Sequence, residues 1–414
     1  MKDFIYNAPT KVLFGKGTEE KTAELIKEYF TSTYGKNLQP RVLVHYGQGH
    51  VVKSGLLSKI ISLLDNEKIF HIELGGVVPN PHVELVRQAV KLCKENSVNF
   101  ILAVGGGSVI DSSKAIGYAL ANPEHDVWEY YEKTQEVHGC YPVGAVLTIS
   151  AAGSEMSNSS VITNNELKLK RGLNTEYSRC KFAVMNPELT MSLPAYQTAS
   201  GAVDILMHTL ERYFAPERSY ITKTEPAEAS GNTILTDKIA ESLMTSVIDA
   251  ASTLIKNPEN YDARAEIMWA SSLSHNGLTG CGGSGDWACH QMEHELGGMF
   301  DCAHGAGIAA IWATWARYVY TKCPERFAKF ARNVMNISDN DSIEEEALAG
   351  ISALENWFKS IAMPVSITEL LGKEISEEEI HELAVKCSFY GKRKVGGFYP
   401  LSIEEMKAIY RAAK

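Results

Sequence analysis

Histidine and carboxylate side chains suited to binding a metal ion gather in two parts of this 414-residue chain. Asp204 and His208 are four residues apart, a spacing that places both side chains on one face of a helix. Four of the 12 histidines lie in a second short region: His275, His290, His294 and His304. One carboxylate and several imidazoles suit a divalent ion such as Zn²⁺ or Fe²⁺. If the two regions meet in the folded chain, the protein is a metalloenzyme.

The same residues also have an ordinary structural explanation. A helical histidine is more often a satisfied core or surface residue than a ligand. The second region is rich in glycine: Gly277, Gly280, Gly282, Gly283, Gly285, Gly297, Gly298, Gly305 and Gly307. Each helical glycine costs about 1 kcal/mol relative to alanine, which indicates close backbone approach to a ligand or else a loop-rich helix junction. Cys281, Cys289 and Cys302 are alternative, softer ligands.

A second kind of site is indicated where a strand-like run ends in glycine. Residues 100–104 read as a buried strand that runs into Gly105-Gly106-Gly107-Ser108 and then a helix. Flexible backbone at a helix N-terminus can cradle a phosphate. A plain tight turn is the alternative, because Ile110 stands where the third glycine of GxGxxG would be. A glycine-containing strand end at residues 47–49 favours a dinucleotide, which needs two neighbouring strand ends.

The elements that must position these residues alternate between strand and helix in the first half of the chain. Strand-like runs lie at residues 41–46, 70–74, 100–104, 143–148 and 182–185, with helix-like stretches at 51–64, 81–95 and 109–120. Alternation of this kind predicts a parallel sheet with helices on its faces. After Pro194 only helical periodicity continues. We therefore expect an α/β dinucleotide-binding domain over residues 1–193 and an all-α metal-binding domain over 194–414.

Composition excludes several classes of protein. A hydrophobic content of 45% and a charged content of 22% are those of a globular protein, and the net charge of −10 argues against nucleic acid as a partner. Uncharged apolar runs long enough to span a membrane are missing from the sequence, as is the apolar core of a signal peptide. Eight cysteines at irregular spacings, without CxxC, predict reduced thiols in a cytoplasmic protein.

An ordered set of motifs resembles the iron-containing (group III) alcohol dehydrogenases, most closely their butanol dehydrogenase-like branch. The motifs are Pro9-Thr10-Lys11-Val12-Leu13-Phe14-Gly15-Lys16-Gly17, Tyr46-Gly47-Gln48-Gly49-His50, Gly75-Gly76-Val77-Val78-Pro79-Asn80-Pro81, Gly105-Gly106-Gly107-Ser108-Val109-Ile110-Asp111, Gly153-Ser154-Glu155, and the segments 202–208 and 290–304. The resemblance covers nearly the whole chain. It implies a Rossmann-like parallel-sheet domain followed by a helical metal-binding domain, the fold shared with dehydroquinate synthase.

The activity that the resemblance implies is metal-dependent and NAD(P)-linked. A hydride would pass between nicotinamide C4 and a metal-bound primary alcohol or aldehyde in the interdomain cleft. The implied ligands of one divalent ion, Fe²⁺ or Zn²⁺, are Asp204, His208, His290 and His304. His294 is not a ligand in this pattern, and it is expected to lie near the nicotinamide and substrate, where it would relay a proton.

The resemblance also implies which residues line the cofactor site. They are Gly47, Gly49, His50, Asn80, Gly106, Gly107, Ser108, Asp111, Thr148, Ser157, Lys170 and Leu189. Lys170 lies in a basic run that also reads as a solvated surface. Three positions depart from the family: Ala152 replaces a threonine, Ser157 a frequent asparagine and His50 a small serine. These departures affect details of cofactor binding rather than the fold or the reaction.

The loop after the first buried strand indicates which nicotinamide cofactor is used. Selection of NAD usually relies on an acidic residue after a strand end, which binds the ribose hydroxyls and repels a 2′-phosphate. Here no acid appears between residue 47 and Asp65. Gln48, His50 and Lys53 could instead receive the phosphate, although the loop also reads as a plain turn. We expect NADP(H) to be preferred over NAD(H).

Other functions remain open at this point. A glycerol-type polyol dehydrogenase and a dehydroquinate synthase-like lyase share the scaffold, but the lyase should carry additional Lys or Arg near the metal, and the sequence from His275 to His304 has none. A non-catalytic metal- and nucleotide-binding sensor is a further alternative. The expected substrate is a small alcohol or aldehyde. An edge strand near residues 11–14 would allow a homodimer to form.

Overall fold

The computed structural model describes residues 3–35, 37–214, 232–337 and 341–414. It divides the chain into two compact units, Ala8–Ser192 and Leu193–Lys414, and the described residues before Ala8 belong to the second. The expected domain boundary lies one residue later, between residues 193 and 194. The expectation also assigned residues 3–7 to the α/β domain, whereas the structure groups them with the helical unit. Within the described ranges, no helix is long and apolar enough to cross a membrane.

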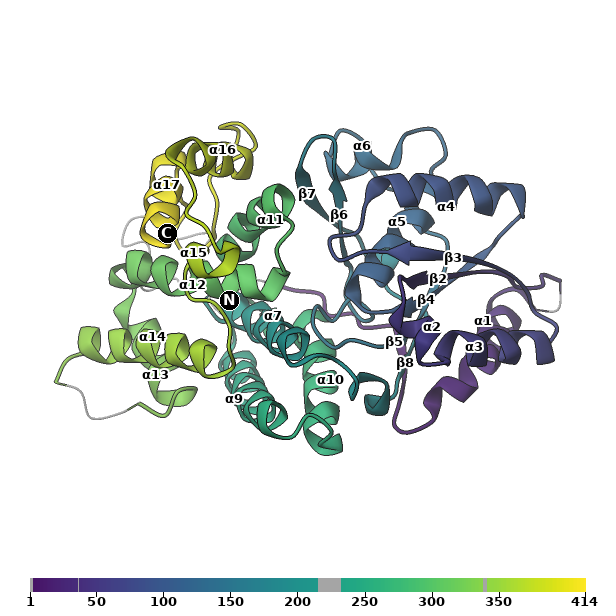
Figure 1. Cartoon of the computed structure of the whole chain (residues 1–414), viewed down its shortest axis with the longest axis horizontal. Helices are drawn as coiled ribbons and strands as arrows, with labels where there is room; N and C mark the ends of the chain where they lie inside the picture. The colour runs from purple at the N-terminus through teal and green to yellow at the C-terminus, as the bar shows by residue number, and fades with distance from the viewer. Residues whose placement is uncertain (1–2, 36, 215–231, 338–340) are drawn as a thin grey trace. The chain divides into compact units, whose positions relative to one another are not determined.

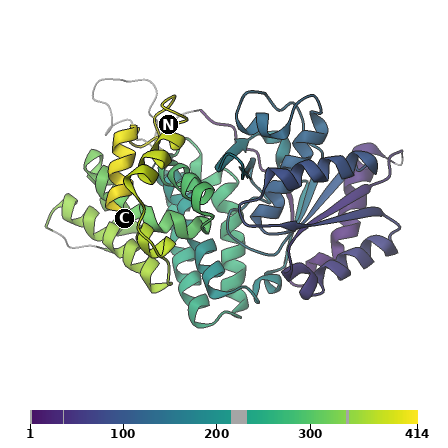
Figure 2. The ribbon, with the colours of Figure 1, turned by 45° about the horizontal axis from the view of Figure 1, so that its top comes forward.

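The first unit is built on a parallel sheet. Its described strands have the order β1-β8-β5-β4-β2-β3 (Figures 1 and 2). Their bounds are β1 Lys11–Phe14, β2 Arg41–Gly47, β3 Phe70–Val77, β4 Phe100–Gly105, β5 Val143–Leu147 and β8 Phe182–Met185. The helices are α1 Thr22–Tyr34, α2 His50–Lys53, α3 Leu56–Asn66, α4 Val83–Glu95, α5 Gly107–Ala121 and α6 Val127–Tyr131. The expected parallel α/β architecture is confirmed.

Helices cover both faces of this sheet. Apolar side chains of α1 and α3 form one core with alternate residues of the central strands, and α4 and α5 pack together over the other face (Figure 1). β4 is buried at every position, as a strand covered on both faces must be. The neighbouring strands β2 and β4 send their connections to opposite faces. Ligands of such sheets bind outside the carboxyl ends of the two strands where this reversal occurs.

Two parts of this unit differ from the sequence expectation. The helix expected over residues 51–64 is two helices, α2 and α3, because Gly55 adopts a left-handed φ of 77° between them. An antiparallel hairpin of β6 (Ser159–Asn164) and β7 (Leu169–Asn174) was not expected. Its β7 strand contains Lys170, which is only 4% exposed, so the solvated interpretation of Lys170 is wrong, although Lys168 in the same basic run is exposed.

The second unit is helical throughout its described residues, as expected, apart from an isolated bridge between Val395 and Leu401. Its helices are α7 Ala195–Tyr213, α9 Ile234–Lys256, α10 Tyr261–His275, α11 Ala288–Phe300, α12 His304–Val319, α13 Pro324–Asn333, α14 Ile343–Ser360, α15 Ile367–Leu371, α16 Glu377–Cys387 and α17 Ile403–Ala412. α7 is buried at every residue from Thr198 to Glu211, so it is the central helix of this unit.

A buried histidine in β2 makes the stability of the first unit depend on pH. His45 is fully buried and hydrogen-bonds the Leu74 carbonyl at 2.8 Å and the Ser112 hydroxyl at 2.9 Å. Burial lowers the pKa of His45 from 6.5 to about 4, because the charged ring would lose its hydration. The folded chain therefore holds a neutral ring where the unfolded chain takes up a proton.

We expect the unfolding free energy to fall by up to about 3 kcal/mol as the pH falls from 6.5 towards 4, because over this range the unfolded chain protonates His45 and the folded chain does not. Urea unfolding of the wild type and His45→Gln at several pH values measures it. The difference between their unfolding free energies should shrink or reverse as the pH falls. A difference that is constant from pH 7 to pH 4 would contradict the assignment.

Candidate functional site

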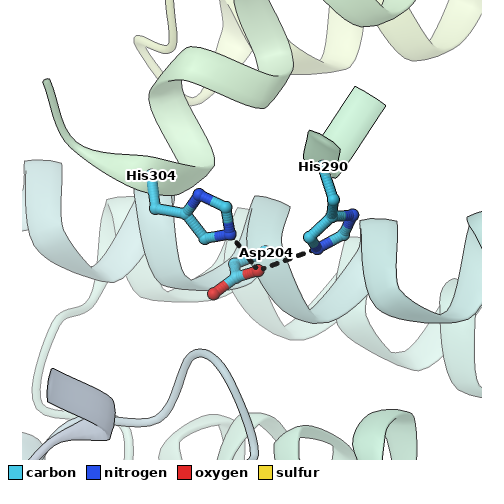
Figure 3. Close-up of side chains that lie close together, drawn as sticks. All are labelled: Asp204, His290 and His304. Carbon is cyan, nitrogen blue, oxygen red and sulfur yellow. Dashed lines mark ion pairs between the residues drawn. The ribbon is translucent and has the colours of Figure 1, made fainter. Parts of the chain in front are cut away.

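Three helices of the second unit bring the expected metal ligands together. α7 carries Asp204 and His208 one turn apart, and α11 carries His290 as its third residue. His304 is the first residue of α12. Figure 3 shows the imidazoles of His290 and His304 turned towards the Asp204 carboxylate from opposite sides. The two histidine-containing regions of the sequence therefore meet in the fold.

Close helix packing explains why glycine follows the last of these histidines. A Cβ atom on Gly305 would overlap the Ser200 carbonyl oxygen, one turn before Asp204 on α7. A Cβ atom on Gly307 would lie 2.8 Å from the Glu293 side chain of α11. These glycines let the start of α12 touch the other two helices. The close approach that glycine permits here is to neighbouring helices rather than to a ligand.

The distances around Asp204 fit a bound cation. Its Oδ1 atom lies 3.2 Å from His208 Nδ1, 3.6 Å from His290 Nε2 and 3.7 Å from His304 Nε2. Tetrahedral ligands about 2.1 Å from a metal ion are separated from one another by roughly 3.4 Å. Among the described residues, Asp204 Oδ1, His208 Nδ1 and His290 Nε2 are buried atoms without a hydrogen-bond partner. Such atoms are costly unless a ligand satisfies them.

Two further carboxylates hold the imidazoles in place. His290 Nδ1 hydrogen-bonds Glu211, and His304 Nδ1 hydrogen-bonds Glu293. Both glutamates are fully buried. A histidine that binds a metal through one nitrogen usually donates its other N–H to such a partner, which fixes the tautomer and the ring orientation. Sequence reasoning missed both glutamates, although each lies three residues after a candidate ligand on the same helix.

The electrostatics of the cluster favour a positive charge at its centre. Burial lowers the pKa of His290, but Glu211 and Asp204 outweigh burial and raise it to about 9. Burial, reinforced by the nearby His275, His290 and Arg212, lowers the pKa of His208 well below 6.5, so this ring is neutral and offers a lone pair. A divalent ion in the cluster would compensate three buried carboxylates.

The cluster is most accessible on the side of α12. The side chains of Asp204, His208 and His290 are 5–7% exposed, whereas that of His304 is 25% exposed. His294 is half-buried on this side, with its ring centroid 5.6 Å from that of His304. Two groups of side chains have ligand atoms that all lie within 4.8 Å of one another: Asp204, His290 and His304, and Glu293, His294 and His304. The expected ligand His208 belongs to neither group, although its Nδ1 atom lies 3.2 Å from Asp204 Oδ1. Neither group includes a cysteine, so the soft-ligand alternative has no support among the described residues.

A set of aromatic and basic side chains lies behind His208. The ring centroid of His208 is 4.0 Å from that of His275. The Nδ1 atom of His275 accepts a hydrogen bond from Arg212 at 3.1 Å. Arg212 also donates to the His208 carbonyl oxygen at 2.8 Å and lies over the Trp287 ring at 4.5 Å. His275 therefore supports a candidate ligand rather than joining the ligand group. No sequence motif connected Arg212 and Trp287 with the site.

The candidate cofactor residues of the first unit gather at the carboxyl edge of the sheet. Most follow a strand directly: Gly47, Gly49 and His50 follow or end β2, Asn80 follows β3, Gly106, Gly107 and Ser108 follow β4, Thr148 follows β5, and Leu189 follows β8. β2 and β4 pair in register from Val42 with Phe100 to Tyr46 with Val104, so their glycine turns are neighbours. This is the crevice where the doubly wound sheet predicts a dinucleotide.

The glycines at this edge are needed for packing. A Cβ atom on Gly106 would lie 2.9 Å from Ile149, and one on Gly107 would lie 3.2 Å from Ala152. Gly106 is the N-cap of α5, so the first backbone N–H groups of that helix lie at the turn. A 15-residue helix that begins there provides partial positive charge for a phosphate.

Three candidate cofactor residues lie deeper than the rest. Asp111 on α5 accepts a hydrogen bond from the Val161 amide at 2.8 Å, which ties α5 to β6. Ser157 is fully buried, and its hydroxyl hydrogen-bonds the amide and carbonyl of Ser159 and the Lys114 ammonium of α5. Lys170 is buried in β7. Their assignment to the cofactor site stays a prediction, and Ser157 is positioned to shape that site rather than to present its hydroxyl there.

A doubly wound α/β unit followed by a helical unit with a buried Asp and His cluster is the architecture that the sequence resemblance implies. Comparison with known families agrees. Residues 9–187 match the family described as iron-containing alcohol dehydrogenase, and residues 198–414 match the C-terminal domain of that family. The chain belongs to the iron-containing alcohol dehydrogenase family, and it is an alcohol dehydrogenase-type oxidoreductase.

Relatives match along the whole chain. The probable NADH-dependent butanol dehydrogenase 1 of Bacillus subtilis is 36% identical, with 100% of each chain covered. The NADPH-dependent aldehyde reductase YqhD of Escherichia coli is 34% identical, also with 100% of each covered. The crystal structure of NADH-dependent butanol dehydrogenase A from Thermotoga maritima is 34% identical and superimposes with a TM-score of 0.90, covering 100% of this chain and 99% of that one.

Proposed function

We propose that this oxidoreductase interconverts primary alcohols and aldehydes with NADP(H) and one divalent ion, Fe²⁺ or Zn²⁺, held by Asp204, His208, His290 and His304. The observation that carries the proposal is the buried Asp204 Oδ1 atom, which faces imidazole nitrogens of all three histidines at 3.2–3.7 Å and has no hydrogen-bond partner among the described residues. Relatives with the same length are named as butanol dehydrogenases or an aldehyde reductase, which supports a small alcohol or aldehyde as substrate.

The chain's own residues have separable tasks in this proposal. Glu211 and Glu293 accept hydrogen bonds from the Nδ1 atoms of His290 and His304, respectively. These bonds keep the proton on Nδ1 and orient each ring with Nε2 towards Asp204. His294, on the accessible side, takes up or delivers the proton of the substrate oxygen. When bound, the divalent ion supplies Lewis acidity for that oxygen, and the nicotinamide accepts or donates the hydride.

The same proposal assigns cofactor binding to the first unit. The amides at the start of α5 and the glycine turn after β2 bind its phosphates, and the residues after β3, β5 and β8 line the rest of the crevice. Asp111, Ser157 and Lys170 are assigned to the same cofactor site, and Asp111 also ties α5 to the hairpin through the Val161 amide.

Two alternatives make different predictions for substrates. A glycerol-type polyol dehydrogenase would prefer vicinal diols, whereas two relatives that match the whole chain support a simple alcohol or aldehyde. A non-catalytic sensor is disfavoured by the enzymatic names of relatives that cover the whole chain. A panel of butanal, butanol and glycerol with both cofactors separates these functions.

A matched pair of variants on α11 tests the metal assignment. We expect His290→Ala to lose both the bound ion and turnover, because a proposed ligand is removed. His294→Ala should retain the ion and lose about 10²–10⁴-fold in kcat, because only proton transfer is impaired. Elemental analysis and steady-state kinetics on butanal provide both readouts. Loss of the ion from His294→Ala, or full activity of metal-free protein, would show that the assignment is wrong.

The loop after β2 tests the cofactor preference. Gln48, His50 and Lys53 are exposed there, and the first carboxylate after the strand is Asp65, in α3. We expect the wild type to favour NADPH. Gln48→Asp should lower kcat/KM for NADPH relative to NADH by about tenfold, or about 1.4 kcal/mol, through repulsion of the 2′-phosphate. Gln48→Asn is the neutral control and should leave the ratio within about twofold. A wild type that favours NADH would refute the proposal.

We also propose a homodimer in the cytoplasm. In the described part of the chain, β1 pairs only with β8, so it is an edge strand of the sheet and can accept a second copy. All eight cysteines are free thiols, as expected for a reducing compartment. Sedimentation at micromolar concentration should give about twice the chain mass of 45.6 kDa. A monomer would refute the dimer.

A further inference from the structure

A fully buried lysine lies below the glycine turn of the first unit. Lys114 is in the middle of α5 and is 0% exposed, within a helix that is buried from Val109 to Leu120. A lysine is almost never fully buried unless its charge is compensated, because the ammonium loses its hydration. The groups that compensate the charge of Lys114 therefore indicate what this residue does.

Carbonyl groups of one short segment surround the ammonium. Lys114 Nζ donates to the carbonyl oxygens of Ser154 at 2.8 Å, Ser157 at 2.9 Å and Ser159 at 2.7 Å. It also lies 3.2 Å from the Ser157 hydroxyl oxygen. An ammonium has three hydrogens, and each has a backbone carbonyl here. Ser154 and Ser157 lie in the connection between β5 and β6, and Ser159 is the first residue of β6, so all three acceptors are 40–45 residues further along the chain.

This segment forms a wall against the glycine turn. The Ser154 hydroxyl oxygen lies 3.4 Å, and the Ala152 Cβ atom 3.2 Å, from the position of a Cβ atom on Gly107. α5 also holds the start of the hairpin beyond the segment, because Asp111 accepts from the Val161 amide. A displacement of the segment would therefore change the space beside the first amides of α5.

We propose that Lys114 is a positioning residue for the cofactor: its buried ammonium draws three carbonyls of residues 154–159 together and so keeps the wall of the glycine turn in the shape that receives the dinucleotide. Without the ammonium, three carbonyl dipoles point at one another in a dry interior, and the segment has to move to satisfy them. The binding site would then have to be reformed by the cofactor, which costs affinity. The inference rests on the proposed placement of the cofactor at this turn.

Lys114→Met tests the proposal, because it retains the length of the side chain and removes the donors. We expect KM for NADPH and the dissociation constant of NADPH, measured by its fluorescence on the intact protein without substrate, to rise about tenfold or more. KM for butanal, and kcat at saturating cofactor, should remain within about threefold. Lys114→Gln restores two donors and should give an intermediate cofactor affinity; it carries the test if the methionine variant does not fold.

Asn122→Ala is the matched control for a general loss of stability. Asn122 caps the same helix at its other end, is 5% exposed, and binds the Tyr118 and Gly139 carbonyls and the His138 amide. It should lower the melting temperature and leave the NADPH dissociation constant unchanged. Gly107→Val, which obstructs the turn itself, separates this inference from the placement of the cofactor.

If Gly107→Val weakens NADPH binding and both Lys114 variants bind NADPH like the wild type, the role of Lys114 is refuted and the placement stands. If neither position affects NADPH binding, both are refuted. Equal weakening by Asn122→Ala and Lys114→Met would also overturn the inference, since the effect would then be one of stability alone.

Discussion

The helical unit depends on a buried carboxylate oxygen that faces three imidazoles. Asp204 lies in the centre of α7, and its Oδ1 atom has no hydrogen-bond donor among the described residues. A buried charge of this kind is tolerated only when a cation or donors compensate it. The packing of α11 and α12 on α7, with glycine at position 305 to permit the contact, brings the compensating groups into place. The fold thus accepts an electrostatic cost that a divalent ion would remove.

Buried charged groups are stabilised in different ways in the two units. In the helical unit, carboxylates and imidazoles leave lone pairs directed at a common point, which is an arrangement for binding something. In the sheet unit, the ammonium of Lys114 is already satisfied by three carbonyls, which is an arrangement for holding the chain still. Preorganisation of this kind lets a cofactor bind without paying to order its site. The two arrangements lie in the two parts of the chain that match the iron-containing alcohol dehydrogenase family, residues 9–187 and 198–414.

The sequence was sufficient for the parts of the fold that are governed by local pattern. β4 was predicted because an apolar run ends in glycines, and α7 because its apolar residues recur at helical spacing. The hairpin of β6 and β7 was missed, since its strands contain lysine, asparagine and serine that are buried only by tertiary packing. Glu211 and Glu293 were missed for a similar reason: their helical spacing from His208 and His290 was visible, but their hydrogen bonds depend on how three helices meet.

The central claim is that one cation lies between Asp204 and three histidines. Anomalous diffraction at the absorption edge of the bound metal, from crystals of protein loaded with Fe²⁺ or Zn²⁺, locates that ion directly. The account predicts a single strong peak per chain within about 2.3 Å of ligand atoms of Asp204, His208, His290 and His304. A peak held instead by Glu293, His294 and His304, or no ordered ion at either position, would contradict it.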